Sequence, residues 1–335
     1  MPLMVSLESF RQAQERLRGI AARTPLVQYF PPGHTHNDRT LRIKPESLQP
    51  IGSFKLRGAY NKIATLSDEE RQRGVITYSS GNHAQGVAYG ARAMGVKACI
   101  VMPRNAPKVK MDATKALGAE IVTVGPASSE RRKKAESLAQ EHGYAIVPPY
   151  DDEQIISGQG TVGMEIYEDL PEADIVLVPI GGGGLISGVS AALKMSGSRA
   201  KIIGVEPELA NDAQQSLRTG KIVTLPAERV SSTLADGLRT QSVGDLNYEI
   251  IKQYVDDIVT VEEDEIREAM RRMMSESRLV VEPSGAVTFA AYLFHEKELP
   301  AGRNVVVVMS GGNIEPSLLA QVMTESDAQS AQTGR

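Results

Sequence analysis

Short apolar runs rich in valine and isoleucine recur along this 335-residue chain and alternate with segments of helical period. Unbroken apolar strands separated by amphipathic helices are typical of a parallel sheet covered by helices on both faces. The sequence therefore predicts an α/β fold. The expected strands are Val75–Tyr78, Lys97–Met102, Glu120–Val124, Tyr144–Val147, Asp174–Pro179, Lys201–Val205, Asp257–Val261 and Asn304–Met309.

The length and the order of the strands indicate two domains. Domains average roughly 150 residues, so a chain of 335 residues has room for two. The four strands between Val75 and Val147 can form a small sheet of their own, inserted into a larger one. We therefore expect a large domain of residues 1–73 and 148–323, a small mobile domain of residues 74–147, and a cleft between them. Residues 324–335, rich in Ser, Gln, Ala and Thr without periodicity, are expected to be a disordered tail.

Charge and composition exclude several classes of protein. The 37 basic and 41 acidic residues give a net charge of −4, and no basic run exceeds Arg131–Lys134, so nucleic acid is not an expected partner. The single cysteine, Cys99, lies in an apolar run, which indicates a buried thiol and a reducing compartment. The sequence shows no signal peptide and no apolar run of the roughly 18 residues that cross a bilayer. These features predict a soluble, cytoplasmic protein without a membrane partner.

Several of the expected strands end in small and polar residues directly before a helix. In an open parallel sheet, ligands bind at the carboxyl ends of the strands, so the turns Ser79–Asn82, Gly181–Gly184 and Ser310–Asn313 are candidate sites. Successive glycines at a strand–helix junction leave backbone N–H groups free to bind a phosphate, although a flexible loop or a dinucleotide-binding turn is the alternative. Ser79 and His83 can help to bind a carboxylate, or serve as an N-cap and a structural residue.

A lysine placed before these turns suggests what they bind. Lys55 stands between Phe54 and the expected start of a helix, in the stretch Gly52–Ala59. Such a lysine can hold an aldehyde cofactor as a Schiff base, as in enzymes that use pyridoxal 5′-phosphate (PLP). Taken alone, a solvated lysine is the commoner interpretation. The glycine-rich and polar turns that follow favour the cofactor.

These motifs, in this order, resemble those of the fold-type II PLP-dependent enzymes, and among them the serine/threonine dehydratases (ammonia-lyases) and serine racemases. The resemblance runs from about Leu7 to Val322. It implies a two-domain fold like that of the tryptophan synthase β subunit, with parallel sheets flanked by helices and the cofactor in the interdomain cleft. It also implies a homodimer.

The resemblance assigns roles to the residues around the cofactor. Lys55 would bind the PLP aldehyde and, once released, remove the α-proton of the substrate. Ser310 would face the pyridine nitrogen, and such a neutral hydroxyl does not force that nitrogen to stay protonated, which favours prompt loss of a β-substituent. Phe54 would pack beside the ring, Asn82 would bond its 3′-oxygen, and Gly181, Gly182, Gly183, Gly184 and Leu185 would bind the phosphate.

Substrate contacts follow from the same resemblance. Ser79, Asn82 and His83 would hold the substrate carboxylate, and Arg131 aligns with an arginine that reaches toward a substrate carboxylate in some racemases. Ser80 is a second catalytic candidate, because many dehydratases carry alanine there whereas racemases and 3-hydroxyaspartate dehydratases carry serine, on the cofactor face opposite the lysine. Racemisation needs an acid–base group on each face. A hydrogen-bonding role in the turn for Ser80 and a solvated helix position for Arg131 are the alternatives.

A cation site is expected elsewhere in the chain. Glu206 and Asp212 follow the strand Lys201–Val205, and two carboxylates with a carbonyl between them suit a hard divalent cation. A solvated acidic turn is the alternative. The resemblance places the metal site of serine racemases at Glu206, the Ala210 carbonyl and Asp212, so Mg²⁺ or Mn²⁺ is expected there as a stabiliser of the fold or dimer.

The sequence thus predicts PLP-dependent dehydration, by β-elimination, of a hydroxy amino acid such as L-threonine or L-serine to a 2-keto acid and ammonia, with serine racemase activity as an addition. Serine racemase or threo-3-hydroxyaspartate dehydratase as the main activity is the alternative. A β-replacement synthase fits less well, because such enzymes usually carry threonine-rich turns in place of Ser79–His83. A dinucleotide-binding oxidoreductase would leave Lys55 and Ser310 without a role, and a PLP-binding regulator without turnover is separable only by assay.

Overall fold

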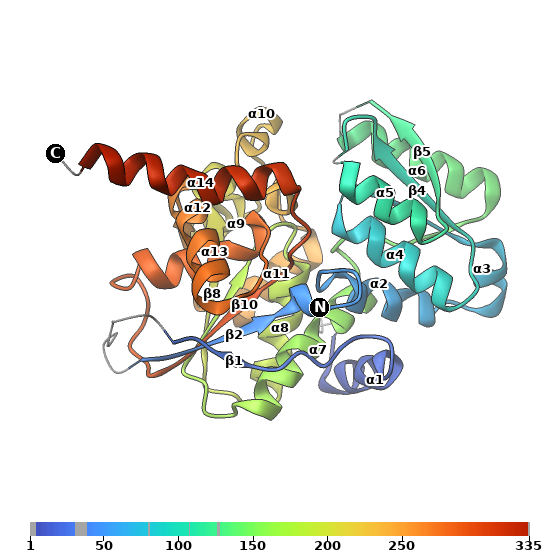
Figure 1. Cartoon of the computed structure of the whole chain (residues 1–335). Coiled ribbons are helices and arrows are strands. Elements are labelled where there is room, and N and C mark those ends of the chain that lie inside the picture. The colour runs from blue at the N-terminus through green and yellow to red at the C-terminus, as the bar shows by residue number, and fades with distance from the viewer. Residues whose placement is uncertain (1–4, 31–38, 80, 107, 126–127, 334–335) are drawn as a thin grey trace.

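The computed structural model describes residues 5–30, 39–79, 81–106, 108–125 and 128–333, without the side chains of residues 128, 129 and 326–333. Within these residues two sheets form two lobes, a six-stranded sheet of order β1-β2-β10-β7-β8-β9 and a four-stranded sheet of order β5-β4-β3-β6 (Figure 1). Neighbouring strands are parallel except β1 and β2. The strands are β1 (Val27–Gln28), β2 (Thr40–Pro45), β3 (Val75–Tyr78), β4 (Ala98–Pro103), β5 (Glu120–Val124), β6 (Ala145–Ile146), β7 (Ile175–Pro179), β8 (Lys201–Pro207), β9 (Asp257–Val261) and β10 (Asn304–Met309).

Helices cover both faces of each sheet, which confirms the predicted α/β class (Figure 1). Helices α12 and α13 pack on one face of the large sheet, and α7, α8 and α11 on the other. The α-helices are α1 (Leu7–Leu17), α2 (Lys55–Ala64), α3 (Asp68–Arg73), α4 (Asn82–Ala93), α5 (Lys108–Ala116), α6 (Ser128–His142), α7 (Glu153–Asp169), α8 (Gly184–Met195), α9 (Asp212–Thr219), α10 (Ala227–Ser231), α11 (Asp245–Tyr254), α12 (Glu263–Arg272), α13 (Pro283–Phe294) and α14 (Pro316–Thr333). Shorter helical turns are η1 (Glu46–Leu48), η2 (Glu208–Ala210), η3 (Asp236–Leu238) and the π-helical η4 (Met273–Ser277).

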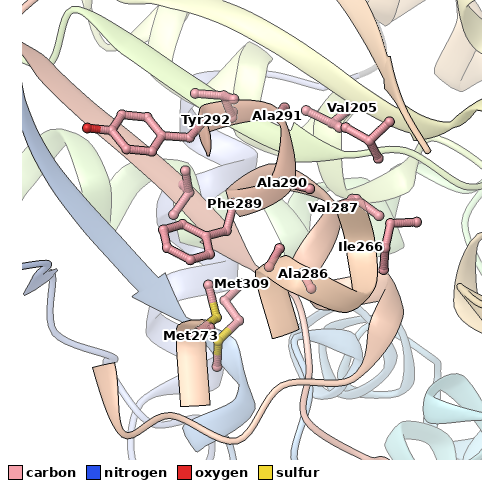
Figure 2. Packing of buried hydrophobic residues seen from close by; sticks show 14 of the residues in the cluster. Val205, Ile266, Met273, Ala286, Val287, Phe289, Ala290, Ala291, Tyr292 and Met309 are labelled. Carbon is pink, nitrogen blue, oxygen red and sulfur yellow. The ribbon is translucent and has the colours of Figure 1, made fainter. Parts of the chain in front are cut away.

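Helix α13 supplies much of the larger hydrophobic core. Figure 2 shows Phe289 and Val287 of this helix beside Met309 of β10 and Val205 of β8. These four side chains are almost completely buried. Removing apolar surface from water stabilises the fold by about 25 cal/mol per Å², so this contact fixes α13, and the turn that precedes it, against the strand ends.

The smaller sheet lies in the second lobe, which is drawn from blue to green in Figure 1. Helices α4 and α5 cover one of its faces and α6 the other. Its four strands fall between Val75 and Ile146, within the range predicted for a small domain. Cys99 of β4 is buried and free, and burial raises the pKa of its thiol to about 11.

All of the predicted strands form, but the sequence does not predict β1 and β2 at the edge of the large sheet. Strand β2 buries Leu41 and Ile43, and it also buries Lys44, whose charge hides the apolar character of the strand. The Lys44 ammonium lies 2.5 Å from the Glu165 carboxylate of α7 and donates to the Thr24 carbonyl at 2.6 Å. Glu165 is distant from Lys44 in the sequence, so no local pattern indicates that this lysine is buried.

A buried ion network joins β2, η1, α2 and α7. Arg57 of α2 contacts Glu46 of η1 at 2.7 Å and Glu165 of α7 at 2.6 Å, and its side chain is 1% exposed. With Lys44 the network contains two cations and two anions. Because Arg57 lies two residues after Lys55, the network fixes the helix that begins with that lysine.

Glycines of α7 let the backbones of α2 and α8 and the Phe10 ring of α1 pack closely against this helix. A Cβ atom at Gly158 would lie 2.6 Å from the Arg57 carbonyl oxygen of α2, and one at Gly163 would lie 2.7 Å from the Val189 carbonyl oxygen of α8. At Gly160 the added atom would meet the Phe10 ring of α1. These glycines have the G-x-G-x-x-G spacing of dinucleotide-binding turns, but they lie inside a helix and follow no strand. Their role is helix packing, which gives the oxidoreductase interpretation no support.

The last helix, α14, enters the segment for which the sequence predicts a disordered tail. Helix α14 continues through Thr333, beyond the start of that segment at Thr324. Val322 is fully buried, and Glu325 forms an ion pair of 2.9 Å with Arg267 of α12, so contacts with the core support the helix. Alanine and glutamine, frequent in this segment, are also good helix formers. Over the described residues, no helix combines the length and the apolar character needed to cross a membrane.

Candidate active site

A cavity of about 350 Å³ lies where the carboxyl ends of strands from both sheets meet. Strands β3, β7 and β10 end at its wall, as the strand-end argument predicts. Ser80 lies outside the described residues. Glu206, Ala210 and Asp212 do not line this cavity, whereas the other predicted residues do: Phe54, Lys55, Ser79, Asn82, His83, Arg131, Gly181, Gly182, Gly183, Gly184, Leu185 and Ser310.

Lys55 is the first residue of α2 and reaches into the cavity. Its ammonium donates to the Pro149 carbonyl at 2.6 Å and lies 5.3 Å from the centre of the Phe54 ring. Burial lowers the pKa of Lys55 to about 8. A substantial share of this amine is therefore neutral near physiological pH, as a nucleophile for an aldehyde requires.

His83, in the first turn of α4, is 2% exposed and bonds the Val147 carbonyl through Nε2 at 3.0 Å. Burial and then the charge of Lys55 lower the pKa of His83 to about 3, so the imidazole is neutral. Because a carbonyl only accepts, Nε2 carries the proton and Nδ1 does not. The ring thus offers no N–H to an anion in the cavity, and its bond to Val147 orients the turn.

Asn82 begins α4 and is held from two sides. Its amide nitrogen donates to the Glu282 carboxylate at 2.5 Å, and its amide oxygen accepts from Asn313 at 2.9 Å. Asn313 in turn donates to the Ile51 carbonyl at 2.8 Å. A primary amide has two N–H groups, so one N–H of Asn82 remains for a ligand.

The turn Gly181–Gly184 connects β7 to α8 and forms an anion cradle. Gly183 has a φ of 95°, a left-handed conformation that favours glycine. A side chain at Gly182 would strike the Tyr150 ring, and Gly184 begins α8, so the backbone itself faces the cavity. Backbone N–H groups at a helix N-terminus bind phosphate favourably.

Ser310 follows β10 and is 4% exposed. Its hydroxyl donates to the Ser284 carbonyl at 3.4 Å, and the Ser284 hydroxyl accepts from the Gly237 N–H at 2.8 Å. A neutral hydroxyl therefore stands at this strand end. Ser79, at the end of β3, accepts from the Gly81 N–H at 3.2 Å, which shapes the neighbouring turn.

The sequence argument misses several ionisable residues of the cavity wall, among them Lys110, Asp236 and Glu282. Lys110 of α5 contacts Asp236 of η3 at 2.7 Å and Glu282 at 3.3 Å. Lys110 and Glu282 have side chains only 4% and 2% exposed. Nothing local sets them apart, except that Glu282 directly precedes Pro283 at the start of α13.

Arg131 of α6 also lines the cavity, where burial lowers the pKa of its guanidinium. Arg132, Lys133 and Lys134 after it are exposed. The structure thus separates Arg131 from the solvated basic face of its helix.

Glu206 and Asp212 form a separate acidic pair, with Ala210 ending the turn η2 between them. Glu206 is completely buried and accepts from the Ala213 N–H at 3.0 Å and the Gln214 N–H at 2.8 Å. The Oδ2 atom of Asp212 is buried without a hydrogen-bond partner among the described residues. Burial raises the pKa of both carboxyls, that of Asp212 to about 7, and the charge of Asp212 raises that of Glu206 further. In the described part of the chain no three His, Cys, Asp or Glu side chains gather as metal ligands, so a cation here also needs backbone oxygen.

Comparisons with known proteins agree with this geometry. The family model described as "Pyridoxal-phosphate dependent enzyme" matches residues 17–311. An L-threonine ammonia-lyase of Thermotoga maritima is 44% identical over 96% of this chain and 79% of its own. An L-threo-3-hydroxyaspartate ammonia-lyase of Saccharomyces cerevisiae is 40% identical over 93% of this chain and 94% of its own. The solved structure of maize serine racemase is 37% identical, with a TM-score of 0.89 over 98% of this chain and 99% of that one. The chain therefore belongs to the pyridoxal-phosphate dependent enzymes and has the fold-type II architecture of its dehydratase and racemase relatives.

Proposed function

We propose that this enzyme dehydrates a small hydroxy amino acid, with L-threonine or L-serine as the first candidates, to a 2-keto acid and ammonia. The observation that carries the proposal is a partly buried lysine, Lys55, with a pKa of about 8, in one cavity with the glycine cradle Gly181–Gly184. The ammonia-lyase relatives described above support the reaction class.

The residues of the cavity fit PLP. Gly181–Gly184 would hold the phosphate, Asn82 the ring oxygen through its remaining N–H, and Ser310 the ring nitrogen. When bound, PLP supplies an aldehyde that captures the substrate amino group and a ring that withdraws electrons from the α-carbon. The neutral Ser310 hydroxyl is too weak an acid to keep the ring nitrogen charged, which favours elimination over longer-lived carbanion chemistry.

Lys55 supplies the base. Once its amine is released, a pKa near 8 suits it to remove the α-proton at physiological pH. The Pro149 carbonyl holds Nζ at the cavity wall. The lysine therefore serves both as the attachment point for the cofactor and as the proton acceptor.

The start of α4 would bind the substrate carboxylate. Its first backbone N–H groups have no partner within the helix and lie at its positive end. Ser79 stands beside them with a hydroxyl able to donate. Since the neutral His83 ring already donates to Val147, we assign to it the shape of this turn rather than a charge for the carboxylate.

Keto-acid release from PLP-loaded protein tests the proposal, with L-serine, L-threonine, D-serine and threo-3-hydroxyaspartate as the panel. We expect keto acid from at least one substrate and none from Lys55→Ala. Lys62→Ala is the matched control, because Lys62 lies on the same helix but pairs with Asp152 outside the cavity. Absence of keto acid from the whole panel would refute dehydration.

Racemisation is a second candidate, supported by Ser80 in the sequence and by the similarity to maize serine racemase. A base on each face of the substrate α-carbon is required, and Ser80 is the residue proposed for the face opposite Lys55. Ser80→Ala should remove interconversion of L- and D-serine and leave keto-acid release from the L-isomer. Equal loss of both activities would contradict this division of roles.

We also propose that Mg²⁺ or Mn²⁺ binds Glu206, the Ala210 carbonyl and Asp212. Two buried carboxylates with raised pKa values, one with an unpartnered oxygen, have the donor chemistry that a hard cation needs. A cation at 100 times its dissociation constant would stabilise the fold by about 2.7 kcal/mol. Thermal unfolding should therefore shift upward from EDTA to Mg²⁺ in wild type and in Glu208→Gln, but not in Asp212→Asn. A shift that persists in Asp212→Asn would place the cation elsewhere.

We propose a homodimer as the assembly. Leu48 and Val280 are each about half exposed, and Gly312 lies against both Val280 and Ser47, the residue before Leu48, so these two apolar side chains are the candidates for the contact. Light scattering should give about twice the mass of one chain, and Val280→Glu should reduce it. A monomeric wild type would refute the dimer.

A further inference from the structure

A chain of polar contacts crosses the cavity wall from the turn before Lys55 to η3. The Ile51 carbonyl accepts from Asn313, Asn313 donates to Asn82, and Asn82 donates to Glu282. Lys110 then bridges Glu282 and Asp236. Two members, Asn82 and Lys110, belong to helices of the four-stranded lobe, and the others belong to the six-stranded lobe.

Lys110 is the cation of this chain and is nearly inaccessible to water. Its side chain is 4% exposed, and its two carboxylate partners are 30% and 2% exposed. Removing one member of a buried ion pair leaves an uncompensated charge, whereas the complete pair resists separation. The two contacts therefore tie α5 to η3 and to the start of α13 across the cavity.

Glu282 transmits this tie to Asn82. One of its oxygens accepts from Asn82 and the other from Lys110. A carboxylate can only accept, so while Glu282 is ionised the amide nitrogen of Asn82 must face it. Burial raises the pKa of Glu282, and the nearby Lys110 charge opposes that rise and so favours the ionised form. With Asn313 on the amide oxygen, the orientation of Asn82 is fixed from both sides.

We infer that Lys110 is a positioning residue: its ion pairs with Asp236 and Glu282 hold the two lobes together over the cavity and keep Asn82 oriented toward the cofactor. The part concerning Asn82 rests on the proposed function, since it takes Asn82 as a cofactor contact. The part concerning the contact between the lobes does not depend on the proposed function. Lys110 itself touches neither substrate nor cofactor in this assignment.

The test uses PLP-loaded wild type, Lys110→Met, Lys110→Arg and the matched control Lys108→Met. Lys108 lies two residues earlier on the same helix and has the same charge, but its side chain is 88% exposed and pairs with Asp112 on its own helix. Steady-state kcat and KM are measured with the best substrate of the panel. Hydrogen–deuterium exchange is measured over α4 and α5, with α8 as an internal reference.

We expect Lys110→Met to keep bound PLP by its visible absorption and to lose about 10- to 100-fold in kcat, the usual effect of misplacing a catalytic contact, with a much smaller change in KM. Exchange should become faster in α4 and α5 but not in α8. Lys110→Arg should restore most of kcat because it keeps the charge, and Lys108→Met should match wild type.

Equal kcat, KM and exchange in Lys110→Met and Lys108→Met would overturn the inference, as would faster exchange spread evenly over the chain. If Lys110→Met does not fold, Asp236→Asn takes its place. Faster exchange in α5 of that variant supports the tie, and unchanged exchange refutes it. If wild type releases no keto acid, the proposed function fails, while the exchange comparison still decides whether Lys110 joins the lobes.

Discussion

Replacing Gly158 by alanine tests whether the crossing of α2 and α7 places the catalytic lysine. The new Cβ would lie 2.6 Å from two backbone atoms, the Arg57 carbonyl oxygen and the Gly58 Cα, about 0.8 Å short of the 3.4 Å of ordinary contact. No side-chain rotation relieves a clash with backbone. Helix α2 must therefore move, and Lys55 at its start must move with it.

The expected cost follows from this geometry. Overpacking a tight core contact costs about 1–3 kcal/mol, and alanine in place of glycine in a helix returns about 1 kcal/mol. Because the obstacle is backbone, we take the upper end, a net loss of about 2 kcal/mol in the free energy of unfolding. A shift of nearly 1 Å at a catalytic group can lower kcat by as much as about 100-fold.

Gly160→Ala is the matched comparison. It lies on the same helix, but the atoms nearest its new Cβ belong to the Phe10 ring of α1, a helix that contributes no residue to the cavity, and the next is the Gly188 carbonyl oxygen of α8 at 3.0 Å, so none of the three nearest belongs to α2. Urea unfolding should show both variants destabilised, whereas keto-acid assays should show a large loss of kcat only for Gly158→Ala. A similar kcat in the two variants would refute the idea that this crossing sets the position of the lysine.

Three further predictions concern charged groups. Arg57→Met should lower the free energy of unfolding by about 3–5 kcal/mol in urea titrations, because Glu46 and Glu165 then lack their buried partner; a loss below about 1 kcal/mol would contradict the network's role. Since burial lowers the pKa of Lys55 to about 8, PLP should reload into apoprotein faster as pH rises through that value, and a midpoint near 10.5 in stopped-flow absorption would refute it. Burial lowers the pKa of His295, but hydrogen bonds to two glutamates outweigh this effect and raise the pKa above 6.5. The imidazolium therefore stabilises the fold fully below pH 6.5. This stabilisation is lost as the pH rises through the raised pKa. His295→Gln should therefore be less stable than wild type near pH 5 by chemical unfolding and should equal it at high pH, and a gap that widens with pH would speak against the pair.

The fold and the centre of the site were accessible from sequence because their signals are local. A buried parallel strand is apolar throughout, and the turn after it changes abruptly to glycine, serine or asparagine, as after Tyr78, Pro179 and Met309. Since parallel strands bring their carboxyl ends to one edge, separate turns can be assigned to one cavity from the sequence alone. Lys55 can be assigned as the attachment point of the cofactor only when it is considered together with those turns.

The features missed depend on contacts between distant parts of the chain. The sequence does not predict strand β2 because it contains Lys44, which is buried only through its ion pair with the distant Glu165. Lys110 looks like a surface lysine until Glu282, far along the chain, faces it. Desolvation and ion pairing decide whether such charged residues can be buried, and a local sequence pattern predicts neither of them.

Helix α2 lies between the two lobes, and each lobe approaches it at a glycine. On one side Gly158 of α7 meets the Arg57 backbone, and on the other a Cβ at Gly86 of α4 would lie 2.9 Å from the carbonyl oxygen of Lys55 itself. In Figure 1 this helix stands where the lobes adjoin. A rotation of the four-stranded lobe about α2 would change the width of the cavity without displacing the amine at its base. The reactive group would lie close to the axis of such a rotation, so opening to admit an amino acid and closing around it would leave the attachment of the cofactor in place.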